Sequence, residues 1–115
     1  MHEFSLMQST LDLAIDHASR HGAERIERIT MRIGDLSGVV ADALQFAFEV
    51  LREGTMAADA ALEIERVPVR CHCASCDSFF EPDGFVYTCP TCGAASRDIR
   101  TGREMELASI EVTGT

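Results

Sequence analysis

The chain has 115 residues, of which 46% are hydrophobic and 25% charged, a composition typical of one globular domain rather than a disordered segment. Nineteen acidic residues against ten basic ones give a formal net charge of −9, which disfavours nucleic acid or an anionic membrane as a partner. All ten basic residues are Arg, which excludes covalent catalysis by Lys and a P-loop lysine.

Two helices and two strands are expected before residue 70. Apolar spacings of three and four residues predict a helix over 5–21, with its stripe formed by Phe4, Met7, Leu11, Ala14 and Ala18. Gly22 supplies the end of that helix. Alternation of Ile29, Met31 and Ile33 with polar residues then predicts a half-buried strand.

The second helix is expected over 40–53, before Gly54. It is apolar over most of its circumference, so we expect it to be well buried, through Leu44, Phe46, Phe48, Val50 and Leu51. A second strand starts at Leu62 and runs towards Val69, and a β-bulge near Arg66–Val67 would explain a change of parity there. Acidic side chains on this strand face arginines of the first strand in the pairs Arg28–Glu63 and Arg32–Glu65.

The last apolar segment, with Met105, Leu107, Ile110 and Val112, is expected to return as a strand to the first sheet. Together these elements predict an α+β fold of two helices packed on a small three-stranded sheet. Residues 70–100 differ in character and form an inserted zinc-ribbon-like module. The expected division is therefore 1–69 and 101–115 as one domain and 70–100 as the module.

Five cysteines lie within 22 positions. Cys73-x2-Cys76 and Cys89-x2-Cys92 form two knuckles that together offer four thiolates, the preferred ligand set of a structural zinc ion. Such a closed cage leaves no open position for catalysis. An odd number of cysteines in one cluster also favours a metal site in a reducing compartment over disulfides, so we expect a cytoplasmic protein. The alternative is a pair of redox dithiols, but neither pair is placed to open a helix.

Cys71 is the spare thiol. We favour Cys73 as the ligand, because Cys71-x4-Cys76 fits a knuckle less well, and expect Cys71 to be a free thiol nearby. His72 is interpreted as an exposed loop histidine. His17 and His21, four residues apart on the first helix, suit a metal by spacing, but no third ligand is evident and an exposed helix edge explains them better.

The chain starts Met1-His2-Glu3. The α-amine of Met1, the backbone nitrogen of His2 and its imidazole can close chelate rings on one ion, and such nitrogen-rich sites suit Ni(II) or Cu(II). Glu3 can add a carboxylate, or can be a helix N-terminal acid favoured by the macrodipole. From spacing alone, an accidental Met-His start is the simpler explanation.

The whole chain nevertheless resembles the HypA/HybF family of hydrogenase-maturation nickel metallochaperones. The resemblance rests on Met1-His2-Glu3, on the two cysteine knuckles, and on Glu27-Arg28-Ile29, Ile33-Gly34-Asp35, Ala47-Phe48-Glu49 and Gly102-Arg103-Glu104-Met105. It implies that His2 is the essential nickel ligand and that Glu3 supports nickel binding or delivery. It also implies structural zinc on Cys73, Cys76, Cys89 and Cys92, and makes residues 1–69 and 101–115 the nickel-binding domain.

The resemblance further implies a carrier rather than an enzyme. Ni²⁺ would be the transferred cargo and Zn²⁺ the resident metal. The expected partners are a nickel-handling GTPase accessory protein, the precursor of a nickel-iron hydrogenase large subunit and, in some organisms, urease maturation proteins. Asp77 and Gly93 follow the knuckles where some members have histidine, so this chain lacks the residues for a pH-responsive ligand exchange at those positions.

One rival function is a zinc-ribbon interaction or nucleic-acid-binding module. Residues 71–92 contain no Arg or Lys and carry acidic residues at 77, 81 and 83, which opposes nucleic-acid binding. Another rival is a redox enzyme using Cys71 or a knuckle pair. Neither rival explains the Met-His-Glu start.

Overall fold

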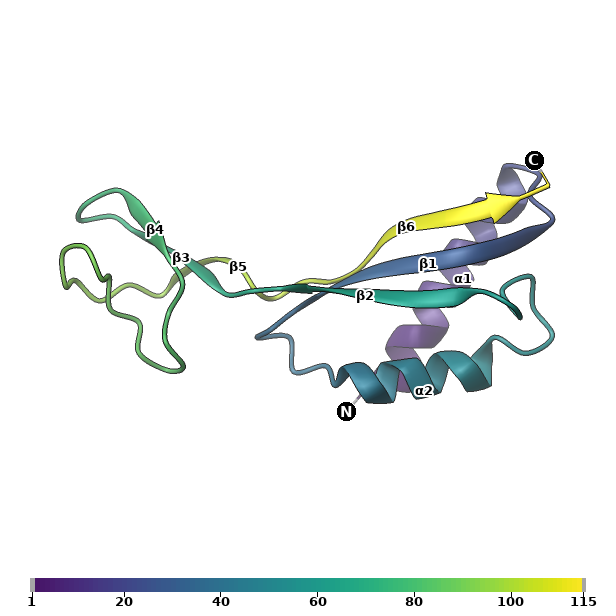
Figure 1. Cartoon of the computed structure of the whole chain (residues 1–115), viewed down its shortest axis with the longest axis horizontal. Coiled ribbons are helices and arrows are strands. Elements are labelled where there is room, and N and C mark those ends of the chain that lie inside the picture. The colour runs from purple at the N-terminus through teal and green to yellow at the C-terminus, as the bar shows by residue number, and fades with distance from the viewer. Residues whose placement is uncertain (1, 115) are drawn as a thin grey trace.

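A computed structural model describes residues 2–114. Its elements are α1 (Glu3–Arg20), β1 (Arg25–Gly34), α2 (Ala41–Leu51), β2 (Ala61–Val67), β3 (Arg70–Cys73), β4 (Ser78–Phe80), β5 (Asp98–Thr101) and β6 (Met105–Thr113). The molecule is elongated, 54 × 28 × 16 Å, with two small sheets at opposite ends (Figure 1). Within the described part of the chain, neither helix has the combined length and apolarity needed to cross a membrane.

The larger sheet has the strand order β2-β1-β6. The central strand β1 pairs parallel with β2 and antiparallel with β6, so the last strand does return to the first sheet as expected. Both helices pack on the apolar face, where the fully buried side chains include Met7, Leu11, Ile29, Met31, Leu44 and Phe48. The α+β fold with two helices on a three-stranded sheet is confirmed.

The other face of this sheet is charged. Arg28 of β1 contacts Glu63 of β2 at 2.6 Å and Glu111 of β6 at 2.8 Å, and Arg32 contacts Glu65 at 3.2 Å. The two predicted cross-strand pairs therefore form. All of these side chains are about half exposed, so water screens the pairs and they add little stability, but the row fixes which face of the sheet stays in water.

One detail of the predicted second strand is wrong. The β1–β2 register runs without a shift through Ile33↔Arg66 and Gly34↔Val67, so there is no bulge at Arg66–Val67. The irregularities of this sheet lie instead between β1 and β6, where the register shifts between Ile26 and Arg28 and again between Thr30 and Met31. The alternation of apolar and polar residues in β2 breaks near its end for a simpler reason: the strand ends at Val67 and the chain then leaves the sheet.

Helix α2 is also less buried than its composition predicts. Leu44, Ala47 and Phe48 form its buried face, but Phe46 is 59% exposed and Val50 is 47% exposed. The helix lies on a single layer of sheet, and nothing in the described chain covers its outer side (Figure 1). An all-round apolar helix needs a second covering layer, which this fold does not supply.

The smaller sheet, β4-β3-β5, carries the cysteine-rich segment. Its buried core consists of Cys71, Cys73, Phe80 and Cys89, with four partly buried neighbours. Three cysteines among four core residues leave little apolar surface to stabilise the fold. This end of the molecule therefore needs another source of stability.

Backbone contacts join the two ends. The end of β1 and the loop after it bind the connection between β5 and β6. Gly34 N–H donates to the Glu104 carbonyl at 2.8 Å, and Leu36 N–H donates to the Gly102 carbonyl at 2.7 Å. A Cβ on Gly34 would lie 2.1 Å from the Gly102 carbonyl carbon, so only glycine allows this approach.

Candidate metal centres

The four knuckle cysteines lie close together beside the smaller sheet; this sheet with its loops is called the smaller lobe, and the larger sheet with its two helices the larger lobe. Cys73 ends β3, Cys76 follows in the turn before β4, and Cys89 and Cys92 lie in the loop between β4 and β5. Their Sγ atoms all lie within 4.8 Å of one another, with Cys73 to Cys92 at 3.5 Å and Cys76 to Cys89 at 3.6 Å. Tetrahedral zinc with Zn–S bonds of about 2.3 Å separates its sulfurs by about 3.8 Å, so this cluster fits that ion.

The cysteines are thiols, not disulfides. All five are free. The backbone explains how each knuckle turns: Asp77 has φ +55° and Gly93 has φ +80°, so each pair is followed by a left-handed residue. Glycine adopts this conformation without strain, and Asp is among the few other residues that tolerate it. Because neither pair begins a helix, the geometry opposes a thioredoxin-type redox site.

Hydrogen bonds already favour a thiolate in the cluster. The Cys92 backbone N–H and the Ser78 hydroxyl donate to the Cys89 sulfur and, against desolvation, lower the pKa of Cys89 to about 6. The Ala94 N–H also lowers the pKa of Cys92. Hydrogen bonds with the other three cysteines of the cluster and desolvation outweigh it and raise the pKa of Cys92 to about 12. The surrounding donors thus favour a thiolate at Cys89, the form in which a cysteine binds a metal ion.

Cys71 lies outside this cluster. It is fully buried in β3, and desolvation together with the nearby charge of Asp98 raises the pKa of its thiol. A protonated, buried thiol is a packing group. The separation of Cys71 from the four clustered sulfurs agrees with the preference for Cys73.

His72 corrects one expectation. It is a strand residue rather than an exposed loop histidine, and its side chain is 16% exposed. Its Nε2 lies 2.8 Å from Asp77 and its Nδ1 lies 3.5 Å from Asp98, while its ring centroid lies 5.0 Å from that of Phe79. These contacts tie the first knuckle to β5 and point the ring nitrogens at carboxylates.

His2 is exposed and occupies the N-cap position of α1, near the middle of the molecule's long axis (Figure 1). Glu3 is 6% exposed, and its carboxylate accepts a 3.0 Å hydrogen bond from the Val40 N–H at the start of α2. This bond is the largest cause of the lowered pKa of Glu3. Glu3 therefore joins the starts of the two helices, a contact that the sequence analysis missed because its partner is a backbone group. The Met1 α-amine lies outside the described residues.

A cavity of about 280 Å³ adjoins the chain start, lined by His2, Ser5, Leu6, Ser9, Val39 and Met105. Its lining is mostly apolar, and His2 is one of the lining residues. Among residues 2–114, only the four cysteines form a group of three or more His, Cys, Asp or Glu side chains close enough for one ion. Within the described residues, His2 therefore does not belong to a group of three or more such side chains.

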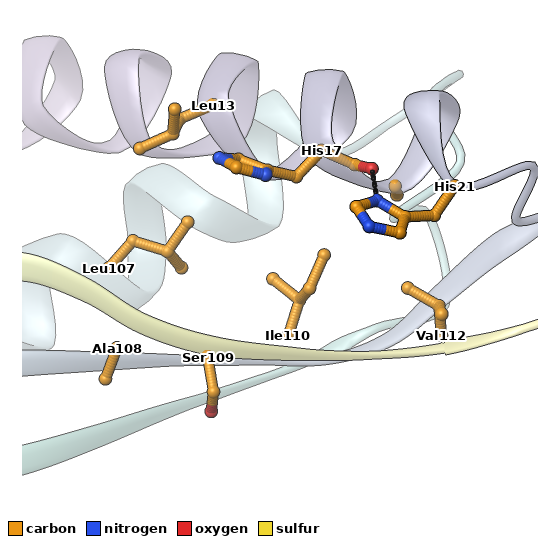
Figure 2. A pocket seen from close by; sticks show the side chains of 9 residues that line it. Leu13, His17, His21, Leu107, Ala108, Ser109, Ile110 and Val112 are labelled. Atoms are coloured by element: carbon orange, nitrogen blue, oxygen red, sulfur yellow. Dashed lines mark hydrogen bonds between the residues drawn. The ribbon is translucent and has the colours of Figure 1, made fainter.

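His17 and His21 border a larger cavity of about 580 Å³ between α1 and β6 (Figure 2). Its floor is formed by Leu107, Ile110 and Val112. His21 Nδ1 is 2.8 Å from the His17 carbonyl, so that nitrogen serves as a donor within the helix. No third candidate ligand joins the two histidines in the described chain, and both are exposed, as expected.

Known proteins resemble this chain along nearly its entire length. The family model described as hydrogenase/urease nickel incorporation, metallochaperone, hypA matches residues 1–112. A hydrogenase maturation factor HypA from a Picosynechococcus species is 49% identical over 112 residues, covering 97% of this chain and 99% of that protein. One from a Roseiflexus species is 46% identical over 112 residues, covering 96% and 91%.

Solved structures agree with the sequence comparison. The solution structure of the Ni metallochaperone HypA from Helicobacter pylori superposes with a TM-score of 0.69 at 32% identity, covering 100% of both chains. A second HypA solution structure gives a TM-score of 0.73 at 34% identity, covering 98% of this chain and 97% of that one. The fold, the cluster of four cysteines and the full-length match lead to one conclusion: the chain belongs to the HypA family of nickel metallochaperones for hydrogenase maturation.

Proposed function

We propose that this protein binds Ni(II) at its N-terminus and delivers it to the precursor of a nickel-iron hydrogenase large subunit. The observation that carries the proposal is the position of His2. It is an exposed imidazole at the start of α1, in a chain of this family, beside a buried and anchored Glu3. An exposed terminus with few ligands lets a recipient replace those ligands one at a time.

The nickel ligands proposed are the His2 imidazole and backbone nitrogen with the Met1 α-amine. Nitrogen-rich tetragonal sites suit Ni(II), and an α-amine loses its proton near pH 8, close to physiological pH. Glu3 supports the site by position. Its carboxylate holds the first turn of α1 against Val40, so His2 extends from a fixed point instead of a frayed end.

The proposed zinc ligands are Cys73, Cys76, Cys89 and Cys92. When bound, zinc supplies structural cross-linking of residues 70–100, whose apolar core is thin. A four-thiolate cage offers no open position, so this metal stays while nickel moves. The two metals are separated by ligand type, thiolates for zinc and nitrogens for nickel.

We further propose that the protein acts in the cytoplasm with a nickel-handling GTPase accessory protein and, in some organisms, with urease maturation proteins. Its role is that of a carrier, which requires no catalytic group. A nucleic-acid role is disfavoured by the net charge of −9 and by the absence of Arg and Lys from residues 71–92.

An equilibrium nickel titration of the zinc-loaded, tag-free protein tests the nickel site. We expect one nickel per chain, lost in His2→Ala while zinc stays bound. His17→Ala is the matched control, because it removes an exposed α1 imidazole and should leave binding intact. Equal nickel binding by the native protein and His2→Ala would refute the N-terminal site.

A second test addresses the α-amine. A tag or acetyl group on Met1 should weaken nickel binding and leave the zinc content unchanged, because only the nickel site uses that nitrogen. Unchanged nickel affinity in the blocked protein would remove the amine from the ligand set.

A further inference from the structure

An exposed apolar patch lies where the two helices meet on the outer side of the larger lobe. Phe4 of α1 is 46% exposed, and Phe46 and Val50 of α2 are 59% and 47% exposed. The rings of Phe4 and Phe46 meet edge to face, with centroids 6.0 Å apart. We call these three residues the Phe4–Phe46 patch. Two aromatic rings held together in water are the type of anchor that protein interfaces favour.

Acidic side chains border the patch on α2. Asp42 and Glu49 lie four residues before and three residues after Phe46, so both share its face of α2, and Glu53 follows in the turn just beyond the helix end at Leu51. None of the three forms an ion pair with another residue of the described chain. Their negative charge is therefore available to a partner.

The nearest basic side chain along this helix does not offset the acidic border. Arg52 donates to the Ala60 carbonyl at 2.7 Å, and its guanidinium lies 5.3 Å from the centre of the Phe48 ring. These contacts direct Arg52 towards the loop after α2. The patch thus combines an apolar centre with a border of one charge sign.

The patch adjoins the chain start. Phe4 is two residues from His2, and the bond between the Glu3 carboxylate and the Val40 N–H holds this end of α1 against the start of α2. A molecule seated on Phe4 and Phe46 would therefore contact the first turn of α1, which begins at the N-cap residue His2. The proposed nickel ligand His2 and the Phe4–Phe46 patch are thus connected through the first turn of α1.

We propose that the Phe4–Phe46 patch is the docking surface for a partner protein that presents apolar side chains flanked by Lys or Arg. This inference rests on the proposed function, since it gives the nickel-exchanging partner a place beside His2. The acidic border selects a cationic partner and opposes both a second copy of this acidic chain and an anionic membrane.

A defined probe tests the chemistry of this surface. A fluorescein-labelled amphipathic helix of Leu and Lys, about 14 residues long, is titrated with the zinc-loaded protein at about 0.15 M salt, and anisotropy gives Kd. The matched probe replaces every Lys by Glu. We expect binding of the Leu/Lys helix only.

Two variant pairs separate the apolar and the charged contributions. Phe46→Ser should raise Kd at least about tenfold, as truncation of an aromatic anchor does. Its control is Val86→Ser, because Val86 is also 59% exposed but lies in the other lobe, and this change should leave Kd unaltered. Glu49→Gln should raise Kd about two- to fivefold, the range for one exposed ion pair, and Glu81→Gln should not.

Several results would overturn the proposal. One is equal binding by Phe46→Ser and the native protein; another is equal binding of the Leu/Glu helix or of phosphatidylglycerol vesicles. Sedimentation showing a native dimer that Phe46→Ser dissociates would assign the patch to a second copy. Nickel titration of Phe46→Ser should match the native protein. If Phe46→Ser loses peptide binding but keeps nickel binding, the loss is assigned to the patch. Equal nickel binding by the native protein and His2→Ala would instead refute the proposed function.

Discussion

Replacing Gly34 by Ala should destabilise the junction between the two lobes more than any exposed substitution. The added Cβ would lie 2.1 Å from both the carbonyl carbon and the oxygen of Gly102, and 2.6 Å from the Arg103 nitrogen. All three are backbone atoms, so no side chain can rotate away. Ordinary contacts begin at 3.4 Å, and the facing strand connection must therefore move by more than about 1 Å.

That movement strains two short hydrogen bonds. Gly34 N–H to Glu104 and Leu36 N–H to Gly102 each contribute about 1 kcal/mol net, and overpacking itself costs about 1–3 kcal/mol. We therefore expect a loss of about 3 kcal/mol in the free energy of unfolding. For a chain of this size, the corresponding fall in Tm is roughly 12 °C.

Thermal and urea unfolding of the zinc-loaded protein, followed by circular dichroism, measure this loss. The control is Gly54→Ala, because its added Cβ meets no atom within 4 Å and its only penalty is a φ of +74°. That conformation costs Ala about 1 kcal/mol. If Gly34→Ala lost no more stability than Gly54→Ala, the close backbone approach would not exist in solution.

Three further outcomes are expected. Cys76→Ser should lose zinc and the dispersed NMR signals of residues 70–101, whereas Cys71→Ser should retain both, as metal analysis and spectra would show. Glu3→Gln should lower the stability at neutral pH, because the folded pKa of Glu3 lies below 4.5. The difference in stability between the native protein and Glu3→Gln is present above pH 4.5 and vanishes as the pH falls through the folded pKa. Urea titrations at a series of pH values would measure it. Phe48→Ala should cost about 3–5 kcal/mol in urea unfolding, since its ring is 1% exposed, while Phe46→Ala should cost less than about 1 kcal/mol.

Much of the larger lobe could be predicted because apolar periodicity reports burial directly. Ile29, Met31 and Ile33 alternate in sequence and are all buried against the helices. The return of the last strand followed from its aliphatic residues, which needed a larger core than the cysteine-rich segment offers. The cysteine spacing was equally informative, because ligand chemistry restricts which sulfurs can share an ion.

The misses share a different cause. Phe46 and Val50 have the composition of core residues but face water, since composition says nothing about whether a second layer exists. His72 belongs to a segment rich in turn-forming residues, yet lies within β3 with carboxylates near both ring nitrogens. Both of these errors came from assigning a side chain to water or core without knowing its neighbours.

Backbone-to-backbone and backbone-to-carboxylate contacts define both places where this protein joins its parts. The loop at Gly34 fixes the smaller lobe to the larger one, and Glu3 fixes the first helix to the start of the second through the Val40 N–H. Neither contact has a complementary side-chain partner that a pattern search can find, because one or both groups are main-chain atoms. For the proposed carrier this arrangement has a physical consequence: the start of α1 and the junction of the two sheets are held by separate contacts, so release of nickel from the proposed site at His2 requires no rearrangement of the four cysteines.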